Sequence, residues 1–355
     1  MRNNLISNQD SYSKQIIRLN LFAVILIASL IISFSGCSSQ KQIAHQSKIV
    51  VFGTVVDITL YHTENETELA AQAIQQVEQQ FHQFHQQWHA WEKGGIISKI
   101  NQAIATQSPI EINQSVKNFI LNSQTLTQQS QGLFDPGIGK LVALWGFHTE
   151  KWQGPPPENK QIQNWLAQQP SLLDIYFEGL TLYSKNPHVQ LDFGGNAKGL
   201  AIDIALNTIK AAGIESAIVS IGGDMKALGS KNGQPWNIGI QNPKDSNQVL
   251  ASIQIQNNES IVTSGTYQRY FEWQGQRYSH ILNPKTGYPA DSFASVTVMH
   301  PDATTADSAA TALLVAGPKD WEKIAKSMGI HYVFCIDQQG RFFQTEAMAR
   351  RIKLL

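Results

Sequence analysis

Two short segments far apart in the chain carry residue types that suit phosphate chemistry. Residues 192–199 hold a carboxylate, a pair of glycines and a lysine. Residues 306–311 place Asp307 and Thr311 four positions apart, so on a helix both side chains would face the same way. Hard oxygen ligands that leave part of a cation's shell open are typical of Mg²⁺ shared with a phosphate-bearing ligand. The two segments therefore predict phosphoryl chemistry.

Each segment also has an ordinary structural explanation when it is taken alone. An Asp in the first turn of a helix is favourable for the helix dipole, and a helical Thr often bonds back to the preceding turn. Gly194 and Gly195 would let a ligand approach the backbone closely, and Lys198 would open a helix whose free N–H groups attract phosphate. The same glycines would also suit a plain strand-to-helix connection, and their spacing fits neither a Walker loop nor a dinucleotide fingerprint.

A candidate base lies in a third segment. His280 precedes a loop rich in Pro and Gly, and a loop histidine can accept a proton near neutral pH. A surface or core histidine is the alternative. A fourth segment, residues 261–270, is expected to be a strand leading into a turn of small residues.

The elements expected around these segments include both helices and strands. A strand at 189–193 should enter the glycine turn, with helix 198–212 after it, and helix 305–316 should stop at Gly317. The remaining expectations are a strand at 49–61 broken at Gly53, helices at 66–91, 115–130 and 160–168, and strands at 217–221, 236–240, 251–255, 295–299 and 332–336. Strands and helices alternate without a regular βαβ rhythm, which favours an α+β sandwich over a doubly wound fold.

The first 36 residues have the features of a lipoprotein signal peptide. Residues 21–32 form an apolar run shorter than the roughly 20 residues that span a bilayer, as in a secretory signal. Residues 34–37 resemble a bacterial lipoprotein cleavage box, so Cys37 is the expected site of lipidation. An uncleaved anchor or an ordinary signal peptide is the alternative. Residues 37–48 would then be a lipidated tether and 49–355 the functional domain. We expect a lipid anchor at the inner membrane, on the periplasmic side, with the outer membrane as the open alternative.

Composition limits the possible partners. The net charge is zero and charged residues make up 15% of the chain, so nothing favours a nucleic-acid partner. Apart from Cys37 the chain has a single cysteine, Cys335, which excludes an internal disulfide in the mature chain. Cys335 lies in an apolar strand and is interpreted as an inert core thiol.

Taken together, the segments resemble the ApbE family, the FAD:protein FMN transferases. The order and spacing of many short motifs, rather than any one of them, carry this resemblance. They comprise residues 52–54, 132–136, 144–147, 192–203, 222–224, 235–240, 263–265, 280–289, 295–298 and 306–311. The resemblance implies a mixed α/β sandwich of two closely packed subdomains with the flavin site between them.

The resemblance also implies roles for individual residues. Mg²⁺ would be held by Asp307, Thr311 and the backbone carbonyl of Gly195, and His280 would be the base. FAD, as the substrate, would be contacted by Phe52 (where Met is more usual), Trp91, Leu133, Phe134, Asp135, Asp192, Lys198 and Leu282. Some family members have an acid directly before the metal-binding Thr, where this chain has Ala310.

The implied reaction moves the FMN part of FAD to a Thr or Ser hydroxyl of an acceptor protein and releases AMP. By resemblance, the acceptors would be subunits of membrane redox complexes. Two alternatives stay open, an FAD pyrophosphatase that uses water and a lipoprotein that binds FAD without chemistry.

Overall fold

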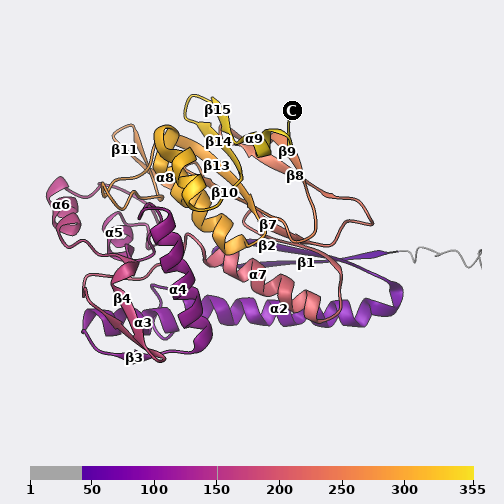
Figure 1. Cartoon of the computed structure of the whole chain (residues 1–355), viewed down its shortest axis with the longest axis horizontal. Helices are drawn as coiled ribbons and strands as arrows, with labels where there is room; N and C mark the ends of the chain where they lie inside the picture. Colours follow the sequence, from indigo (N-terminus) through magenta and orange to yellow (C-terminus); the bar gives the residue numbers. More distant parts are fainter. Residues whose placement is uncertain (1–41, 150) are drawn as a thin grey trace, which may run out of the picture. The chain divides into compact units, whose positions relative to one another are not determined.

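The computed structural model describes residues 42–149 and 151–355 (Figure 1). The expected signal peptide, Cys37 and the first part of the expected tether lie outside this range. The described chain from Gln42 onward forms one compact unit. Within that part of the chain, no helix is both long enough and apolar enough to cross a bilayer.

An eight-stranded sheet is the centre of the unit, and every neighbouring pair of its strands is antiparallel. Their spatial order is β1 (Ile43–Val51), β2 (Thr54–His62), β6 (Ser216–Ile221), β7 (Asp224–Leu228), β10 (Ser260–Gly265), β13 (Phe293–His300), β14 (Tyr332–Asp337) and β15 (Phe342–Gln344). The strands expected at 217–221, 295–299 and 332–336 are therefore confirmed.

The first hairpin corrects two expectations. The segment 49–61 is not one interrupted strand, because the chain reverses at Phe52 and Gly53, which have φ values of 60° and 66°. Two consecutive positive φ values are typical of the tight turns that join antiparallel strands. β1 also begins at Ile43, inside the expected tether, because its residues alternate in exposure and pair with β2 along their whole length.

Three helices cover one face of the large sheet (Figure 1). They are α2 (Thr67–Trp88), which follows the short helix η1 (Glu64–Glu66), α7 (Ala197–Ala211) and α8 (Ala303–Ser327). α7 packs against both of the others, and α8 lies on β10 and β13. Gly317, with φ 68° and ψ −177°, interrupts α8 where the sequence predicted its end, and a further helical stretch continues from Pro318.

The opposite face of the large sheet is covered by a small sheet. Apolar residues of the two sheets form one core, including Trp236 and Ile253 from the small sheet and Ile261 and Phe334 from the large one. The covering elements are β8 (Trp236–Asn242), β9 (Asp245–Ile255), β16 (Ile352–Leu354) and α9 (Glu346–Ala349). The result is a layered mixed α/β fold, as the sequence indicated.

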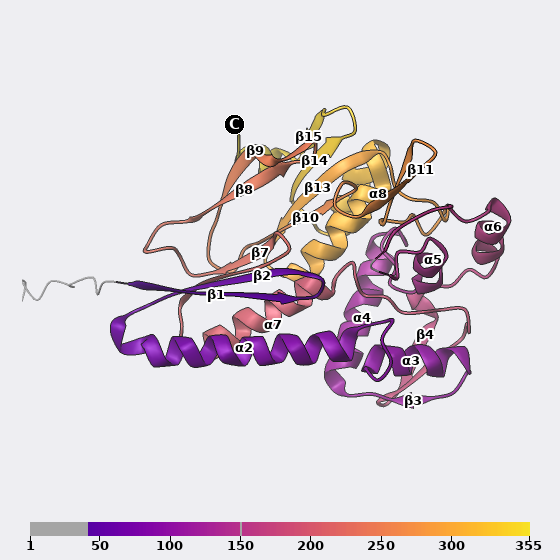
Figure 2. The same cartoon turned by 180° about the vertical axis from the view of Figure 1, so that it is seen from behind.

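A second group of elements gathers at the C-terminal end of α2 (Figure 2). It comprises α3 (Ile96–Ala105), β3 (Ile110–Glu111), α4 (Gln114–Gln129), α5 (Gly139–Leu144), α6 (Asn159–Ala167), η2 (Leu172–Asp174), β4 (Ile175–Glu178) and β5 (Thr181–Ser184). A hairpin of β11 (Tyr270–Trp273) and β12 (Gln276–Ser279) contributes Phe271 to one of its cores. The two expected subdomains are thus two groups of hydrophobic cores within one compact unit. The first group lies on the two faces of the large sheet, and the second lies among the elements at the end of α2.

The strand expected at 189–193 does not form. On one side, Gln190 forms an isolated parallel bridge with Ile138, and the N–H of Asp192 donates to the carbonyl of Pro136 at 2.8 Å. The side chain of Asn101 takes the place of a second strand, since it accepts from the N–H of Leu191 at 2.7 Å and donates to its carbonyl at 2.9 Å. Polar side chains of this kind compete with strand ladders for backbone groups. The segment therefore enters the glycine turn as an extended loop.

Candidate active site

A cleft of about 570 Å³ lies where the two groups of cores meet. One wall comes from the loops around α5, and the other from the β10–β11 loop, the loop after β12 and α8. Most of the residues predicted from the sequence line it, namely Leu133, Phe134, Asp135, Asp192, Gly195, Lys198, His280, Leu282, Asp307 and Thr311. The structure therefore brings the glycine turn and the 306–311 segment into one site.

The expected metal ligands lie close together. A Cβ atom added at Gly195 would lie 3.7 Å from Thr311 Oγ1, so the glycine turn passes directly over this hydroxyl. Thr311 Oγ1 is also 3.2 Å from Ser264 Oγ. One carboxylate oxygen of Asp307 accepts from the backbone N–H of Gly199 at 3.0 Å, and the other makes no hydrogen bond with any described residue. A cation could thus contact a carboxylate, a hydroxyl and a backbone carbonyl in this corner.

The electrostatics of Asp307 fit a bound cation. Its side chain is buried, and burial raises its pKa to about 7, although the ammonium of Lys198 acts in the opposite direction. A buried carboxylate needs a compensating charge, which a divalent ion would supply. Across residues 42–149 and 151–355, no cluster of three or more His, Cys, Asp or Glu side chains could hold a metal. Such a sparse ligand set would leave coordination positions for phosphate oxygens.

Lys198 is held by a carboxylate that was not among the predicted site residues. Its Nζ forms an ion pair with Asp224, whose other oxygen accepts from the N–H of Thr263 at 3.0 Å. Burial alone would lower the pKa of Lys198, but the carboxylates of Asp224 and Asp307 outweigh it and raise the pKa. The side chain is therefore a fixed ammonium beside the glycine turn. The motif at 222–224 was the signal for Asp224 in the sequence.

His280 is held in one orientation by Arg269. The carbonyl of Arg269 lies 3.0 Å from His280 Nδ1 and also accepts from its backbone N–H at 3.0 Å. With Nδ1 carrying the proton of that bond, Nε2 has a free lone pair. Burial, reinforced by the positive charge of Arg269, lowers the pKa of His280 to about 4. The imidazole is accordingly neutral near pH 7 and can accept a proton.

Phe52 and Trp91 lie beside the cleft and are not among its lining residues. Phe52 forms the turn between β1 and β2, and its ring packs edge-on against Phe81 and Phe84. The cleft wall there is instead Gly53 and Thr54.

Trp91 lies three residues beyond the end of α2, not within it. Its Nε1 donates to Asp192 Oδ2 at 2.9 Å, while Asp192 Oδ1 accepts from the N–H of Gly194 at 2.8 Å. Trp91 therefore contacts the cleft residue Asp192 without lining the cleft itself.

The carboxylate of Asp135 serves the fold of the cleft wall. It accepts from the N–H groups of Gly137 and Leu172 and from the hydroxyl of Ser171, at 2.6–2.8 Å. Burial raises its pKa despite these bonds. Asp135 lines the cleft, but its carboxylate oxygens join the loop before α5 to the start of η2. The cleft is also lined by five residues that were not among the predicted site residues, although three of them lie in the segments 144–147 and 261–270: Gln241, Phe147, Trp152, Tyr267 and Arg269.

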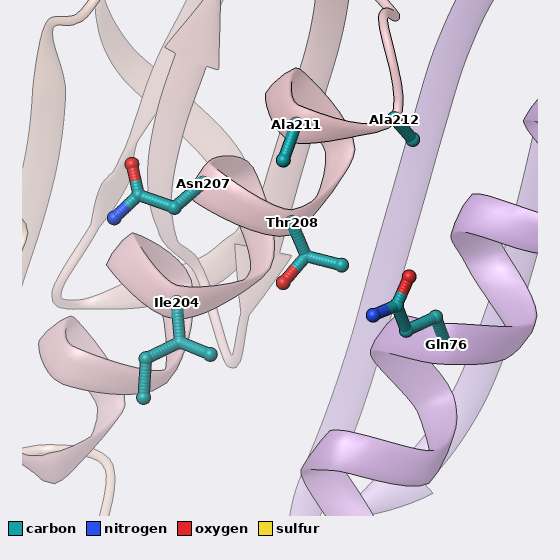
Figure 3. Close-up of a pocket in the computed structure, with 6 residues that line it drawn as sticks. All are labelled: Gln76, Ile204, Asn207, Thr208, Ala211 and Ala212. Carbon is teal, nitrogen blue, oxygen red and sulfur yellow. The ribbon is translucent and has the colours of Figure 1, made fainter.

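A second hollow lies between α2 and α7 (Figure 3). Its lining residues are Gln76, Ile204, Asn207, Thr208, Ala211 and Ala212. None of these side chains is titratable, and they supply only amide, hydroxyl and methyl groups. This hollow therefore lacks the charged and titratable side chains that line the first cleft.

Comparison with known proteins gives consistent matches. A sequence model of the ApbE family matches residues 52–334. A protein of Rhodobacter capsulatus named FAD:protein FMN transferase is 36% identical over 85% of this chain, and the match spans 57% of that relative's length. A protein of the same name from Haemophilus influenzae is 28% identical over 94% of this chain and 98% of its own. The crystal structure of the ApbE protein from Thermotoga maritima superposes with a TM-score of 0.80 at 29% identity, covering 87% of this chain and 99% of the other.

Proposed function

The chain belongs to the ApbE family, and we propose that it is an FAD:protein FMN transferase. It transfers the FMN part of FAD to a Thr or Ser hydroxyl of an acceptor protein. The observation that carries this proposal is the meeting of Asp307, Thr311 and Gly195 with the fixed ammonium of Lys198 in one cleft. Carboxylate, hydroxyl and carbonyl oxygens beside a cation form a site for a diphosphate.

The balance of the reaction defines what the cleft must do. The acceptor's hydroxyl oxygen forms a bond to the FMN phosphorus, and the bond from that phosphorus to the bridging oxygen breaks. The bridging oxygen leaves with AMP. Mg²⁺, held by Asp307, Thr311 and the carbonyl of Gly195, would supply positive charge to the diphosphate when bound. Lys198 adds a second fixed positive charge beside the glycine turn.

His280 is the base in this proposal. Its side chain lines the cleft, its Nδ1 is anchored on the carbonyl of Arg269, and its Nε2 is unprotonated near neutral pH. It therefore takes the hydroxyl proton of the acceptor as the new phosphoester bond forms. Apolar and aromatic side chains of the opposite wall, including Phe134, Phe147 and Leu282, provide the surface for the flavin rings.

We also propose that a lipid on Cys37 tethers the chain to the inner membrane, facing the periplasm. The apolar run at 21–32 and the cleavage box that ends at Cys37 support this. Several acyl chains, at about 0.8 kcal/mol per buried methylene, would anchor the chain stably. Acceptors in membrane redox complexes would then be within reach. Mass spectrometry of the mature N-terminal peptide should find Cys37 with acyl chains, and an unmodified Cys37 would refute the anchor.

Three outcomes of one incubation separate the functions left open by the sequence. The protein is mixed with FAD, Mg²⁺ and a candidate acceptor domain, and the products are resolved by chromatography and mass spectrometry. We expect an acceptor with covalent FMN, together with AMP in equal amount. Free FMN with AMP would instead indicate a pyrophosphatase, and intact FAD would indicate a binding protein.

A further inference from the structure

Arg269 is a charged group of the cleft that is paired with no carboxylate in the described part of the chain. It lies in the loop between β10 and β11 and lines the cleft. Its guanidinium makes no ion pair and no hydrogen bond with any described residue, although its backbone carbonyl accepts two bonds from His280. By contrast, the cleft's lysine, Lys198, is paired with Asp224.

The position of the guanidinium is defined on two sides. Its Cζ lies over the ring of Trp152 at 5.9 Å from the centroid, a distance at which cation–π attraction orients the planar group. Its Nη2 reaches the β1–β2 turn, since a Cβ atom added at Gly53 would lie 3.9 Å from it. The group therefore lies between a loop of one cleft wall and a turn of the other, with donor N–H groups free for a ligand.

The charged side chains of the cleft favour an anionic ligand that carries phosphate groups. Lys198 is paired with Asp224, and a divalent cation would pair with Asp307. The other two carboxylates of the cleft, Asp135 and Asp192, accept hydrogen bonds from neighbouring N–H groups. The diphosphate of FAD is doubly anionic, and the guanidinium of Arg269 offers it a positive charge that no carboxylate of the described residues pairs with. A guanidinium also matches the geometry of phosphate oxygens with two parallel hydrogen bonds.

We propose that the guanidinium of Arg269 binds the diphosphate of FAD. The inference rests on the proposed function and adds a binding residue to it. Because the carbonyl of the same residue holds His280, phosphate binding at the guanidinium also fixes the diphosphate relative to the base. One residue thus joins substrate recognition to the position of proton transfer. The competing interpretation is an arginine that only stacks on Trp152.

Equilibrium binding measured without acceptor protein tests the proposal. Flavin fluorescence is titrated with wild type and with Arg269→Gln in Mg²⁺, using FAD and, separately, riboflavin, which has the rings without phosphate. We expect the Kd for FAD to rise about 10- to 100-fold, the usual effect of losing charge-assisted hydrogen bonds. The Kd for riboflavin should change less than about 2-fold. Arg269→Lys, which keeps the charge and loses the fork, should fall between wild type and Arg269→Gln.

Arg277→Gln is the matched control. Arg277 lies on the neighbouring β12, stacks on Tyr270 at 3.9 Å and pairs with Glu272, but it does not line the cleft. The Arg277→Gln variant should bind FAD and riboflavin with the same Kd values as wild type. An unchanged Kd for FAD in Arg269→Gln would overturn the inference, and so would an equal loss for FAD and riboflavin. If wild type itself bound no FAD, the proposed function would fail, and this inference with it.

Discussion

At the scale of single residues, Asp307 decides whether the site depends on a metal. Asp307→Asn keeps the shape and removes the charge, so the variant should lose cation binding. We expect Mg²⁺ with FAD to raise the melting temperature of wild type and to leave that of Asp307→Asn unchanged. Transfer should fall on the order of 100-fold or more. The exposed Asp291→Asn is the control, and an Asp307→Asn variant that still responds to Mg²⁺ would remove the ligand assignment.

His280 gives a prediction about pH. Because burial lowers its pKa to about 4, the folded chain holds a neutral imidazole in a range where the unfolded chain binds a proton. Its contribution to stability is complete above pH 6.5 and is lost as pH falls toward 4, by at most about 1.4 kcal/mol per pH unit. Urea unfolding should therefore depend less steeply on pH in His280→Gln between pH 6.5 and 4.5. An NMR titration that placed the wild-type imidazole pKa near 6.5 would contradict this.

At the scale of elements, the sequence predicted best where periodicity reflects burial. The apolar spacing of α2 and the stop at Gly317 were predictable because each depends on local residues. β1 was missed over residues 43–48 because it is polar and lies at the edge of its sheet, where alternate side chains are exposed. The segment at 189–193 has the composition of a strand, but Asn101, about 90 residues earlier in the chain, takes both backbone hydrogen bonds of Leu191. No local pattern encodes that contact.

The contact between α7 and α8 depends on Gly199. A Cβ atom added there would lie 2.3 Å from the carbonyl oxygen of Ala303, so Gly199→Ala must push the helices apart. Alanine gains about 1 kcal/mol in helix propensity, but overpacking costs about 1–3 kcal/mol, and we expect net destabilisation in urea unfolding. The shift would also weaken the bond from Gly199 to Asp307 and reduce stabilisation by Mg²⁺. The control is Asn207→Ala, at an exposed position on the same helix, which should not lower the free energy of unfolding. A Gly199→Ala variant as stable as wild type would show that α7 and α8 can move apart without cost.

At the scale of the whole molecule, the site is a product of chain topology. The four-residue spacing of Asp307 and Thr311 predicted a shared face, but spacing alone did not place Gly195 over Thr311; the resemblance to a family did. Asp224 and Arg269 were passed over because each acts through a partner distant in sequence, Lys198 in one case and Trp152 in the other. Residue types thus indicated the chemistry, while the packing of two groups of cores determined which residues perform it.

Because the two walls of the cleft belong to different groups of cores, a bound substrate should restrict the motion of both. FAD with Mg²⁺ should slow amide hydrogen exchange on both walls, in residues 133–138 of one and 263–269 of the other, since a ligand that contacts both must restrict both. The hollow between α2 and α7, around residues 204–212, lies outside the cleft and should exchange at an unchanged rate. Exchange measured by mass spectrometry with and without ligand provides the comparison. Protection confined to one wall would mean that FAD does not bridge the two groups of cores, and the arrangement of base, metal ligands and flavin surface proposed here would be wrong.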